Sequence, residues 1–198
     1  QLLVDWSSGD DVYVVNGTRD DGVYNDFHFE NVGHGVDIDN SSGSFVLETE
    51  WGTTVGYGFT EFGDTRYADT FIGSSMYEEF SFHNGGTDTV TGGEGRDRFR
   101  LDPASNETKL MVLDYESGEE ISLERMGFDS SRLDQQITVS SRQLNGEDYT
   151  YISVSTDTYS QTDLVTIKGD FILADMEYQT SDGDVELAFY DADPVNAL

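Results

Sequence analysis

Cysteine is absent from the 198-residue sequence, which excludes disulfide bonds, thiolate metal sites and cysteine nucleophiles. Basic residues are also scarce, because 10 Lys and Arg stand against 40 Asp and Glu, giving a formal net charge of −30. A surface this acidic repels the phosphates of nucleic acids and of anionic membranes, so we expect neither as a partner. No run of 18 apolar residues occurs, and we therefore expect no transmembrane helix and no membrane insertion.

Helical periodicity is rare as well. Short runs of β-branched and aromatic residues alternate with Gly, Asp, Asn and Ser, a pattern that predicts an all-β fold. The aromatic content of 13% distinguishes the chain from a disordered acidic tail. Asn145-Gly146 lies between two strand-like runs and predicts a tight hairpin. The only helix we expect is a short one around residues 122–126.

The chain divides into three regions that differ in their pattern of turn residues and strand-like runs. Residues 1–63 place polar turns between strand-like runs and predict an irregular N-terminal β region that continues into the next part. Residues 64–100 form a repeat. Residues 101–198 predict a C-terminal β cap, a sheet or hairpin that closes the end of the repeat. The strand-like runs outside the repeat are 12–15, 27–30, 45–50, 53–60, 137–144, 149–154, 164–167, 171–173 and 185–189.

The repeat consists of nine-residue units with one inserted residue, Phe82. Position 6 of each unit is acidic and position 8 is apolar. These positions are Asp69, Glu78, Asp88 and Asp97, and Phe71, Phe80, Val90 and Phe99, respectively. Six residues of each unit predict a tight turn and three predict a short strand, so that a full coil takes about 18 residues. We therefore expect Phe71 beside Val90 in one sheet, and Phe80 beside Phe99 in the facing sheet.

The same register stacks the acids of successive coils, Asp69 on Asp88 and Glu78 on Asp97. Carboxylates roughly 5 Å apart, the spacing of neighbouring strands, repel one another unless a cation lies between them. Oxygen ligands without sulfur or imidazole suit Ca²⁺ better than Zn²⁺, and better than the strict octahedron of Mg²⁺. The alternative is a series of metal-free β-turns, but turns alone do not require an acid at position 6 of every unit.

The last unit, residues 92–100, matches G-G-x-G-x-D-x-U-x at each specified position. It resembles the nonapeptide of the RTX (repeat-in-toxin) calcium-binding β-roll. Residues 112–123 and 163–169 resemble segments that follow the repeats in serralysin-type proteases and in the R-modules of alginate epimerases. The resemblance covers residues 64 to about 190, and it implies a right-handed parallel β-roll over residues 64–100.

The resemblance also implies a set of calcium ligands. Its side-chain ligands are Asp69, Asp88 and Asp97. Glu78, at position 6 of the second unit, departs from the pattern but is long enough to reach an ion. The carbonyl ligands are those of Gly86, Gly93 and Gly95. Tyr67 and Met76 stand where the family has glycine, so we expect two or three ions in the repeat. Further candidate metal ligands in the N-terminal region are Asp37, Asp39 and Asp11.

By the same resemblance, the chain is the C-terminal part of a larger secreted, extracellular protein. We expect export by the type I secretion machinery and folding on Ca²⁺ binding outside the cell, where calcium is about millimolar. Residues 185–198 are the candidate secretion signal.

Two other hypotheses remain open. The second hypothesis is that the protein binds a polysaccharide or a cell-surface ligand. Its candidate binding residues are Trp51 and Tyr57, at the 52–58 segment, and Arg96, Arg98 and Arg100, on one face of the last unit. A small carbohydrate-active enzyme is the third and ranks lowest, since no complete catalytic constellation is present. The three histidines are not spaced as a zinc motif, and His28, between Phe27 and Phe29, is expected on a solvent-facing side. We expect no enzymatic activity.

Overall fold

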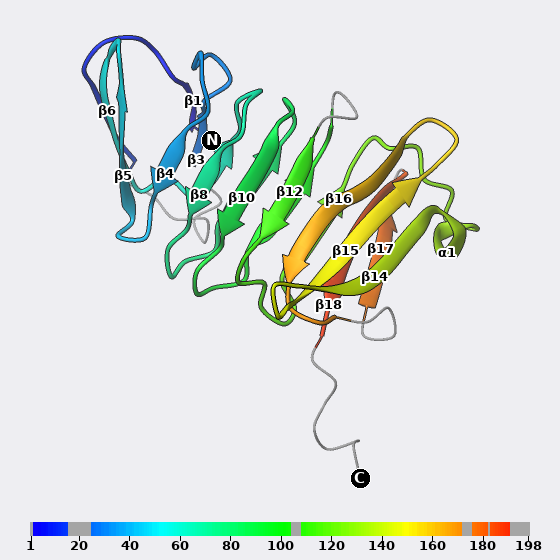
Figure 1. Ribbon diagram of the computed structural model, residues 1–198. Coiled ribbons are helices and arrows are strands. Elements are labelled where there is room, and N and C mark those ends of the chain that lie inside the picture. Colours follow the sequence, from blue (N-terminus) through cyan, green and yellow to red (C-terminus); the bar gives the residue numbers. More distant parts are fainter. Residues whose placement is uncertain (1, 16–24, 104–107, 172–175, 182, 191–198) are drawn as a thin grey trace.

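The structure is a computed structural model that describes residues 2–15, 25–103, 108–171, 176–181 and 183–190 (Figure 1). In these residues the chain forms 18 strands and one short helix, α1 (Leu133–Gln136), so the predicted all-β class is confirmed. No helix among them is long and apolar enough to span a bilayer.

The strands form three sheets. The first sheet runs, in spatial order, β1 (Leu2–Asp5), β3 (Asn25–His28), β7 (Glu61–Gly63), β9 (Glu79–Phe82), β11 (Arg98–Leu101), β13 (Glu120–Leu123), β18 (Asp184–Phe189) and β17 (Met176–Ser181). The second runs β14 (Ile137–Leu144), β15 (Glu147–Ser155), β16 (Ser160–Lys168), β12 (Lys109–Val112), β10 (Thr87–Thr91), β8 (Thr70–Ile72) and β4 (Asp37–Asp39). The third is β2 (Asp11–Val14), β6 (Gly52–Tyr57) and β5 (Ser44–Thr49).

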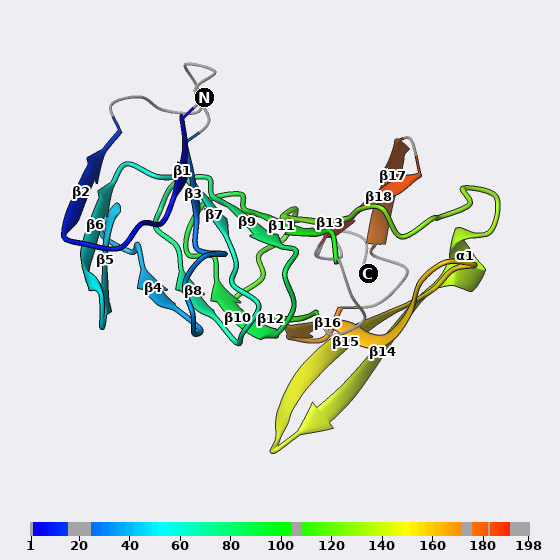
Figure 2. The same cartoon turned by 90° about the horizontal axis from the view of Figure 1, so that it is seen from above.

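Between β7 and β13, consecutive strands alternate between the first and second sheets (Figure 2). From β9 to β13, each strand pairs in parallel with the strand two places earlier in the chain. This winding continues past residue 100, the predicted end of the repeat, because β12 and β13 extend both sheets. The turns between the strands therefore stack along the two sides of the molecule.

The predicted register is present in both sheets. Val90 pairs with Phe71 in the second sheet, and Phe99 pairs with Phe80 in the first. The coil through these strands takes 19 residues and not the expected 18, because Phe82 is a fully buried member of β9. The next coil is longer still, since the turn at Gly92 bonds to a residue 22 positions later.

The core between the first two sheets is largely aromatic. Phe62, Phe80 and Phe99 stack along the first sheet with ring centroids 5.8 and 6.0 Å apart. Phe71 of the second sheet meets Phe80 at 5.9 Å. Burial of these rings, each worth roughly 1.5–3 kcal/mol, is the main force that holds the two sheets together.

Strands of the N-terminal region pair with both of these sheets and also form a third. β1 and β3 extend the first sheet and β4 extends the second, while β2, β5 and β6 form the small third sheet. The predicted strands at 12–15, 27–30, 45–50 and 53–60 correspond to β2, β3, β5 and β6, with ends shifted by up to three residues.

The C-terminal region adds antiparallel strands at the far end of both sheets. β14 and β15 form the predicted hairpin, with Asn145 and Gly146 at φ 56° and 87°. The helix expected at residues 122–126 was wrong. Residues 120–123 form β13 because Ile121 and Leu123 are buried, and the helix lies at 133–136. Most of the predicted 171–173 strand, and residues 191–198 of the predicted signal, lie outside the described residues.

Candidate metal-binding turns and an outer groove

The position-6 acids lie where the turns meet the strands: Asp69, Glu78 and Asp97 directly precede a strand, and Asp88 is the second residue of β10. The two sides of the winding arrange them in two columns. Asp69 and Asp88 form the first acid column. Glu78 and Asp97 form the second acid column, and Glu119 of the next turn continues it. All five side chains are buried, with at most 2% exposed. The structure thus brings together all four acids that the repeat predicted, and it adds Glu119.

Within each column, an acid accepts a hydrogen bond from the backbone of the acid one coil earlier. The Asp69 amide donates to Asp88 Oδ1 at 2.9 Å, and the Glu78 amide donates to Asp97 Oδ1 at 2.7 Å. These bonds fix one oxygen of each carboxylate against the neighbouring turn. The acids therefore order the stacking of the turns as well as carrying charge.

Among the described residues, the carboxyl groups of Asp97 and Glu119 contact each other, but four buried carboxylate oxygens in these columns receive no hydrogen bond from an N–H or hydroxyl group. They are Asp88 Oδ2, Glu78 Oε2, Asp97 Oδ2 and Glu119 Oε1. A buried polar atom without a partner costs about 1–3 kcal/mol, and more if it is charged. Three of the four lie in the second acid column, which makes that column the stronger candidate for a cation.

Burial raises the pKa of each of these acids. The pKa of Asp97 rises to about 9 and that of Asp88 to about 8, while the pKa values of Glu78 and Glu119 rise to about 7. The charge of the neighbouring acid in the column adds to the effect on Asp97 and Asp88. Without a cation, the columns therefore favour protonated, uncharged carboxyl groups near neutral pH.

Asp69 differs from the other predicted ligands. Its Oδ1 accepts the Val36 amide at 2.8 Å, and its Oδ2 accepts the Thr65 amide at 2.7 Å. The Thr65 hydroxyl also donates to Oδ1, so both oxygens of Asp69 accept hydrogen bonds within the protein. Of the four acids in the repeat, Asp69 is the one whose contacts least require a metal.

The predicted carbonyl ligands belong to glycines at which a side chain would prevent the turns from stacking. Gly86 and Gly93 have φ of +96° and +93°, and a Cβ on either would lie 2.1 Å from a carbonyl oxygen of the previous turn. Gly95 has φ +134°. The Gly86 carbonyl already accepts the Lys109 amide at 2.9 Å, so one of its lone pairs is used within the protein.

The N-terminal candidates do not converge. Asp37 and Asp39 are both exposed on β4, and Asp39 Oδ1 accepts the Ser41 amide at 3.0 Å, which with the Ser41 hydroxyl lowers its pKa. Asp11 accepts a hydrogen bond from the Ser7 hydroxyl at 2.8 Å. Among the described residues, none of the three belongs to a group of three converging carboxylate or imidazole ligands.

The predicted ligand-binding residues do not form one surface. Trp51 is 45% exposed and stacks on His34, whereas Tyr57, 44% exposed, lies at the opposite end of β6, roughly 20 Å away at the rise of an extended strand. Arg98 and Arg100 lie on one face of β11, and Arg96 lies in the turn before it. Each is paired with a carboxylate, at 3.6 Å from Glu120 for Arg96, 2.6 Å from Glu186 for Arg98 and 2.7 Å from Glu124 for Arg100. This face is therefore not a free cationic patch.

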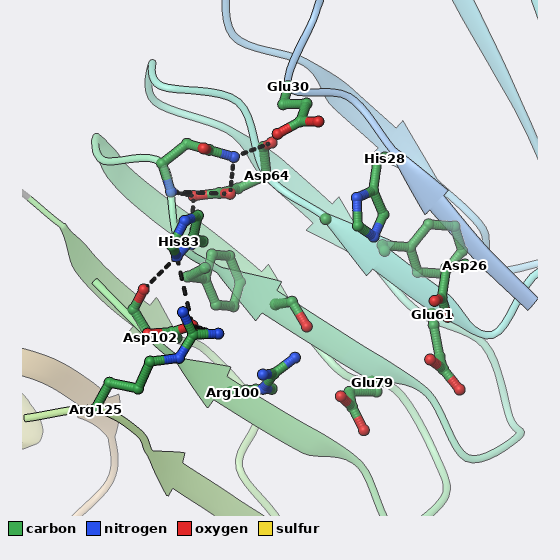
Figure 3. A pocket seen from close by; sticks show the side chains of 15 residues that line it. Asp26, His28, Glu30, Glu61, Asp64, Glu79, His83, Arg100, Asp102 and Arg125 are labelled. Atoms are coloured by element: carbon green, nitrogen blue, oxygen red, sulfur yellow. Dashed lines mark hydrogen bonds and ion pairs between the residues drawn. The ribbon is translucent and has the colours of Figure 1, made fainter. Parts of the chain in front are cut away.

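A groove that the sequence did not predict lies on the outward side of the first sheet (Figure 3). It has a volume of about 250 Å³, and its floor is formed by β3, β7 and β9. Its two guanidinium groups, those of Arg100 and Arg125, pair with Glu124 and Asp102 at 2.7 and 2.5 Å. The remaining charged groups along it are acidic, so the groove favours cations over anions. They are Asp26, Glu30, Glu61, Asp64 and Glu79.

Sequence reasoning missed Glu119 and the groove for different reasons. Glu119 continues the second acid column, but the longer coil removes it from the nine-residue register. The groove depends on the pairing of β3 with β7, and β4, β5 and β6 lie between these two strands in the chain. No family model matches the sequence, and a search of the curated proteins finds no match.

Proposed function

We propose that the protein is a calcium-binding RTX module whose turns form a parallel β-roll, and that it folds on binding Ca²⁺ after secretion. The observation that carries this proposal is the set of four buried carboxylate oxygens that receive no hydrogen bond from an N–H or hydroxyl group. They recur at the stacked position 6 of successive turns and, in the case of Glu119, at its continuation. Such oxygens are the donor type that Ca²⁺ prefers, and the columns contain neither sulfur nor imidazole.

The second acid column is the site we propose to hold calcium most strongly. Glu78, Asp97 and Glu119 would supply the carboxylate oxygens, and Asp88 would do so on the other side. Gly92 favours this role for Asp97, since a Cβ at Gly92 would lie 2.5 Å from Asp97 Oδ2 and fill the space beside it. Calcium, when bound, supplies the positive charge that allows these carboxylates to remain ionised while buried.

Folding would then be linked to calcium concentration. In a compartment low in calcium, folding requires either burial of like charges or the uptake of several protons, and both oppose it near neutral pH. In an extracellular medium with about millimolar calcium, binding favours the folded state by mass action. Three ions would neutralise six charges of the net −30, so that calcium accounts for the turns and not for the whole acidic surface.

Circular dichroism and thermal unfolding of the whole chain test this function. We expect β structure and a cooperative transition in millimolar CaCl₂, and loss or marked weakening of both in EGTA at pH 7.5. MgCl₂ at the same concentration should not substitute, because Mg²⁺ demands a stricter geometry. A transition that is the same in EGTA and in calcium would contradict the proposal. Polysaccharide binding stays a prediction, to be tested separately by titration with alginate and neutral glycans.

A further inference from the structure

A second group of metal-ligating side chains lies away from the stacked turns. Asp5 at the end of β1, His28 at the end of β3 and Glu30 just beyond it each offer one ligand atom, and these atoms all lie within 4.8 Å of one another. The group lies at the N-terminal end of the first sheet. His28 and Glu30 line the groove, and both side chains are labelled among its lining residues in Figure 3.

The backbone holds the three residues in this arrangement. Asp5 and His28 are direct partners in the parallel pairing of β1 with β3, and the Trp6 amide donates to the His28 carbonyl at 2.9 Å. Phe29 is fully buried, so that His28 and Glu30 on either side of it project outward together. The anchoring of Phe29 in the aromatic core therefore fixes where these two ligands emerge.

Nothing else in the described part of the chain occupies these side chains. Asp5, His28 and Glu30 take part in no hydrogen bond or ion pair there through their side-chain atoms, either with one another or with a neighbour. Glu79, Glu186 and Glu124 near the same face are paired with arginines, whereas among the described residues no such pairing involves Asp5, His28 or Glu30. Their spacing leaves room between them for an ion.

We propose that Asp5, His28 and Glu30 bind one divalent transition-metal ion of the zinc type. One imidazole nitrogen with two carboxylate oxygens suits Zn²⁺, whereas Ca²⁺ takes oxygen ligands and is disfavoured by the imidazole. Three protein ligands with a fourth position open is the arrangement of zinc sites that remain accessible to a further ligand.

The geometry requires only small movements of exposed side chains. Ligand atoms about 2.1 Å from a tetrahedral ion lie about 3.4 Å apart. Since the three atoms lie within 4.8 Å of one another, no pair must close by more than about 1.4 Å. Asp5 and Glu30 are exposed and free to rotate, while His28 is half-buried, and its ring lies 3.1 Å from where a Cβ on Gly63 would be. His28 is therefore the fixed member, and the two carboxylates close on the ion.

The site is independent of the proposed calcium-binding turns. It draws no ligand from positions 69 to 119: Asp5 and His28 end two strands of the first sheet, and Glu30 lies in the turn after β3. Saturating the turns with calcium therefore leaves it free to bind zinc, and failure of either proposal does not imply failure of the other.

The histidines provide a direct test, since the chain has three. Imidazole signals of the calcium-loaded protein are followed by ¹H–¹⁵N NMR while ZnCl₂ is added, with calcium kept in large excess to suppress binding to other carboxylates. We expect the His28 ring to shift and to saturate at one equivalent, with His34 and His83 unchanged. Shifts of another histidine in place of His28, or of none, would overturn the proposal.

Calorimetry with matched variants completes the test. Glu30→Gln should weaken zinc binding by at least about tenfold and His28→Gln should abolish it, whereas His34→Gln, a change at an exposed ring outside the group, should leave it unchanged. Unfolding in calcium shows whether each variant keeps its fold. Should His28→Gln fail to fold, Glu30→Gln at the exposed position decides. Zinc affinity equal to that of the unchanged protein in either folded variant would refute the site.

Discussion

The backbone amide of Glu78 donates a hydrogen bond to the side chain of Asp97, 19 residues later, at 2.7 Å. This contact joins two turns and leaves the second oxygen of Asp97 buried without a hydrogen bond from an N–H or hydroxyl group. One oxygen of Asp97 thus holds two coils together, and its other oxygen favours binding of a cation. Replacing its charge without changing its shape separates the two roles.

Asp97→Asn is the corresponding variant. The amide oxygen can still accept from Glu78, but the negative charge that would bind calcium is lost. For one site at calcium 100 times its dissociation constant, the stabilisation amounts to about 2.7 kcal/mol. We expect most of that gain to disappear, while unfolding in EGTA is unchanged or shifted to higher temperature. The measurement is thermal unfolding with and without calcium.

Asp134→Asn is the control for this experiment, because it removes one charge from an exposed position on α1. Its calcium-dependent gain should equal that of the unchanged protein. If Asp97→Asn also kept the full gain, the second acid column would not be the calcium site.

The raised pKa values predict an unusual pH dependence for the metal-free protein. Asp88 and Asp97, with pKa values of about 8 and 9 in the folded state, bind protons there that the unfolded chain releases above about pH 4. Stability therefore falls as pH rises from about 4 to about 9, since the folded state holds more protons than the unfolded state. In EGTA, we expect a higher unfolding temperature at pH 5 than at pH 8.

Calcium should reduce or reverse this dependence, because it binds the ionised carboxylates. Unfolding scans at both pH values, each with EGTA and with calcium, give the comparison. A metal-free protein that becomes more stable between pH 5 and pH 8 would be inconsistent with acids buried in this way.

Several features of the fold could be predicted from the sequence because they depend on local periodicity. The nine-residue repeat predicted that Phe80 pairs with Phe99. The turn conformations that Asn-Gly favours predicted the hairpin at Asn145-Gly146. The helix expected at 122–126 failed for a tertiary reason, because Ile121 and Leu123 alternate into the core as part of β13.

The candidate sites divide in the same way. Position 6 of the repeat identified the acid columns directly, but not which oxygens would lack partners, since Asp69 is satisfied by Val36 and Thr65. The group around His28 depends on the pairing of β1 with β3. The sequence between these strands does not follow the nine-residue repeat, so it does not indicate which residues pair. Long-range pairing of this kind is not encoded in sequence spacing.

Gly93 offers a test of how tightly the turns stack. With φ at +93° and a Cβ that would meet the Ser74 carbonyl oxygen at 2.1 Å, Gly93→Ala adds a steric clash to backbone strain. Strain alone costs about 1–3 kcal/mol, and we expect the variant to lose more than that. Gly43→Ala is matched to it, because Gly43 has φ +75° but open space around it. Equal losses in calorimetric unfolding of the two variants would show that the turns can move apart.

Tyr115 connects the last acid of the second column to the C-terminal strands. Its hydroxyl donates to the Glu119 carbonyl and accepts the Phe189 amide at 3.0 Å, so it bridges the turn before β13 and the end of β18. Tyr115→Phe leaves both buried backbone groups without this partner, and we expect a loss of about 1–3 kcal/mol. Hydrogen exchange should report faster exchange at Phe189, with β9 and β10 little affected. Tyr57→Phe, a change at an exposed ring, is the control. Unchanged protection at Phe189 in Tyr115→Phe would mean that the pairing of β18 with β13 and β17 holds the strand without this bridge.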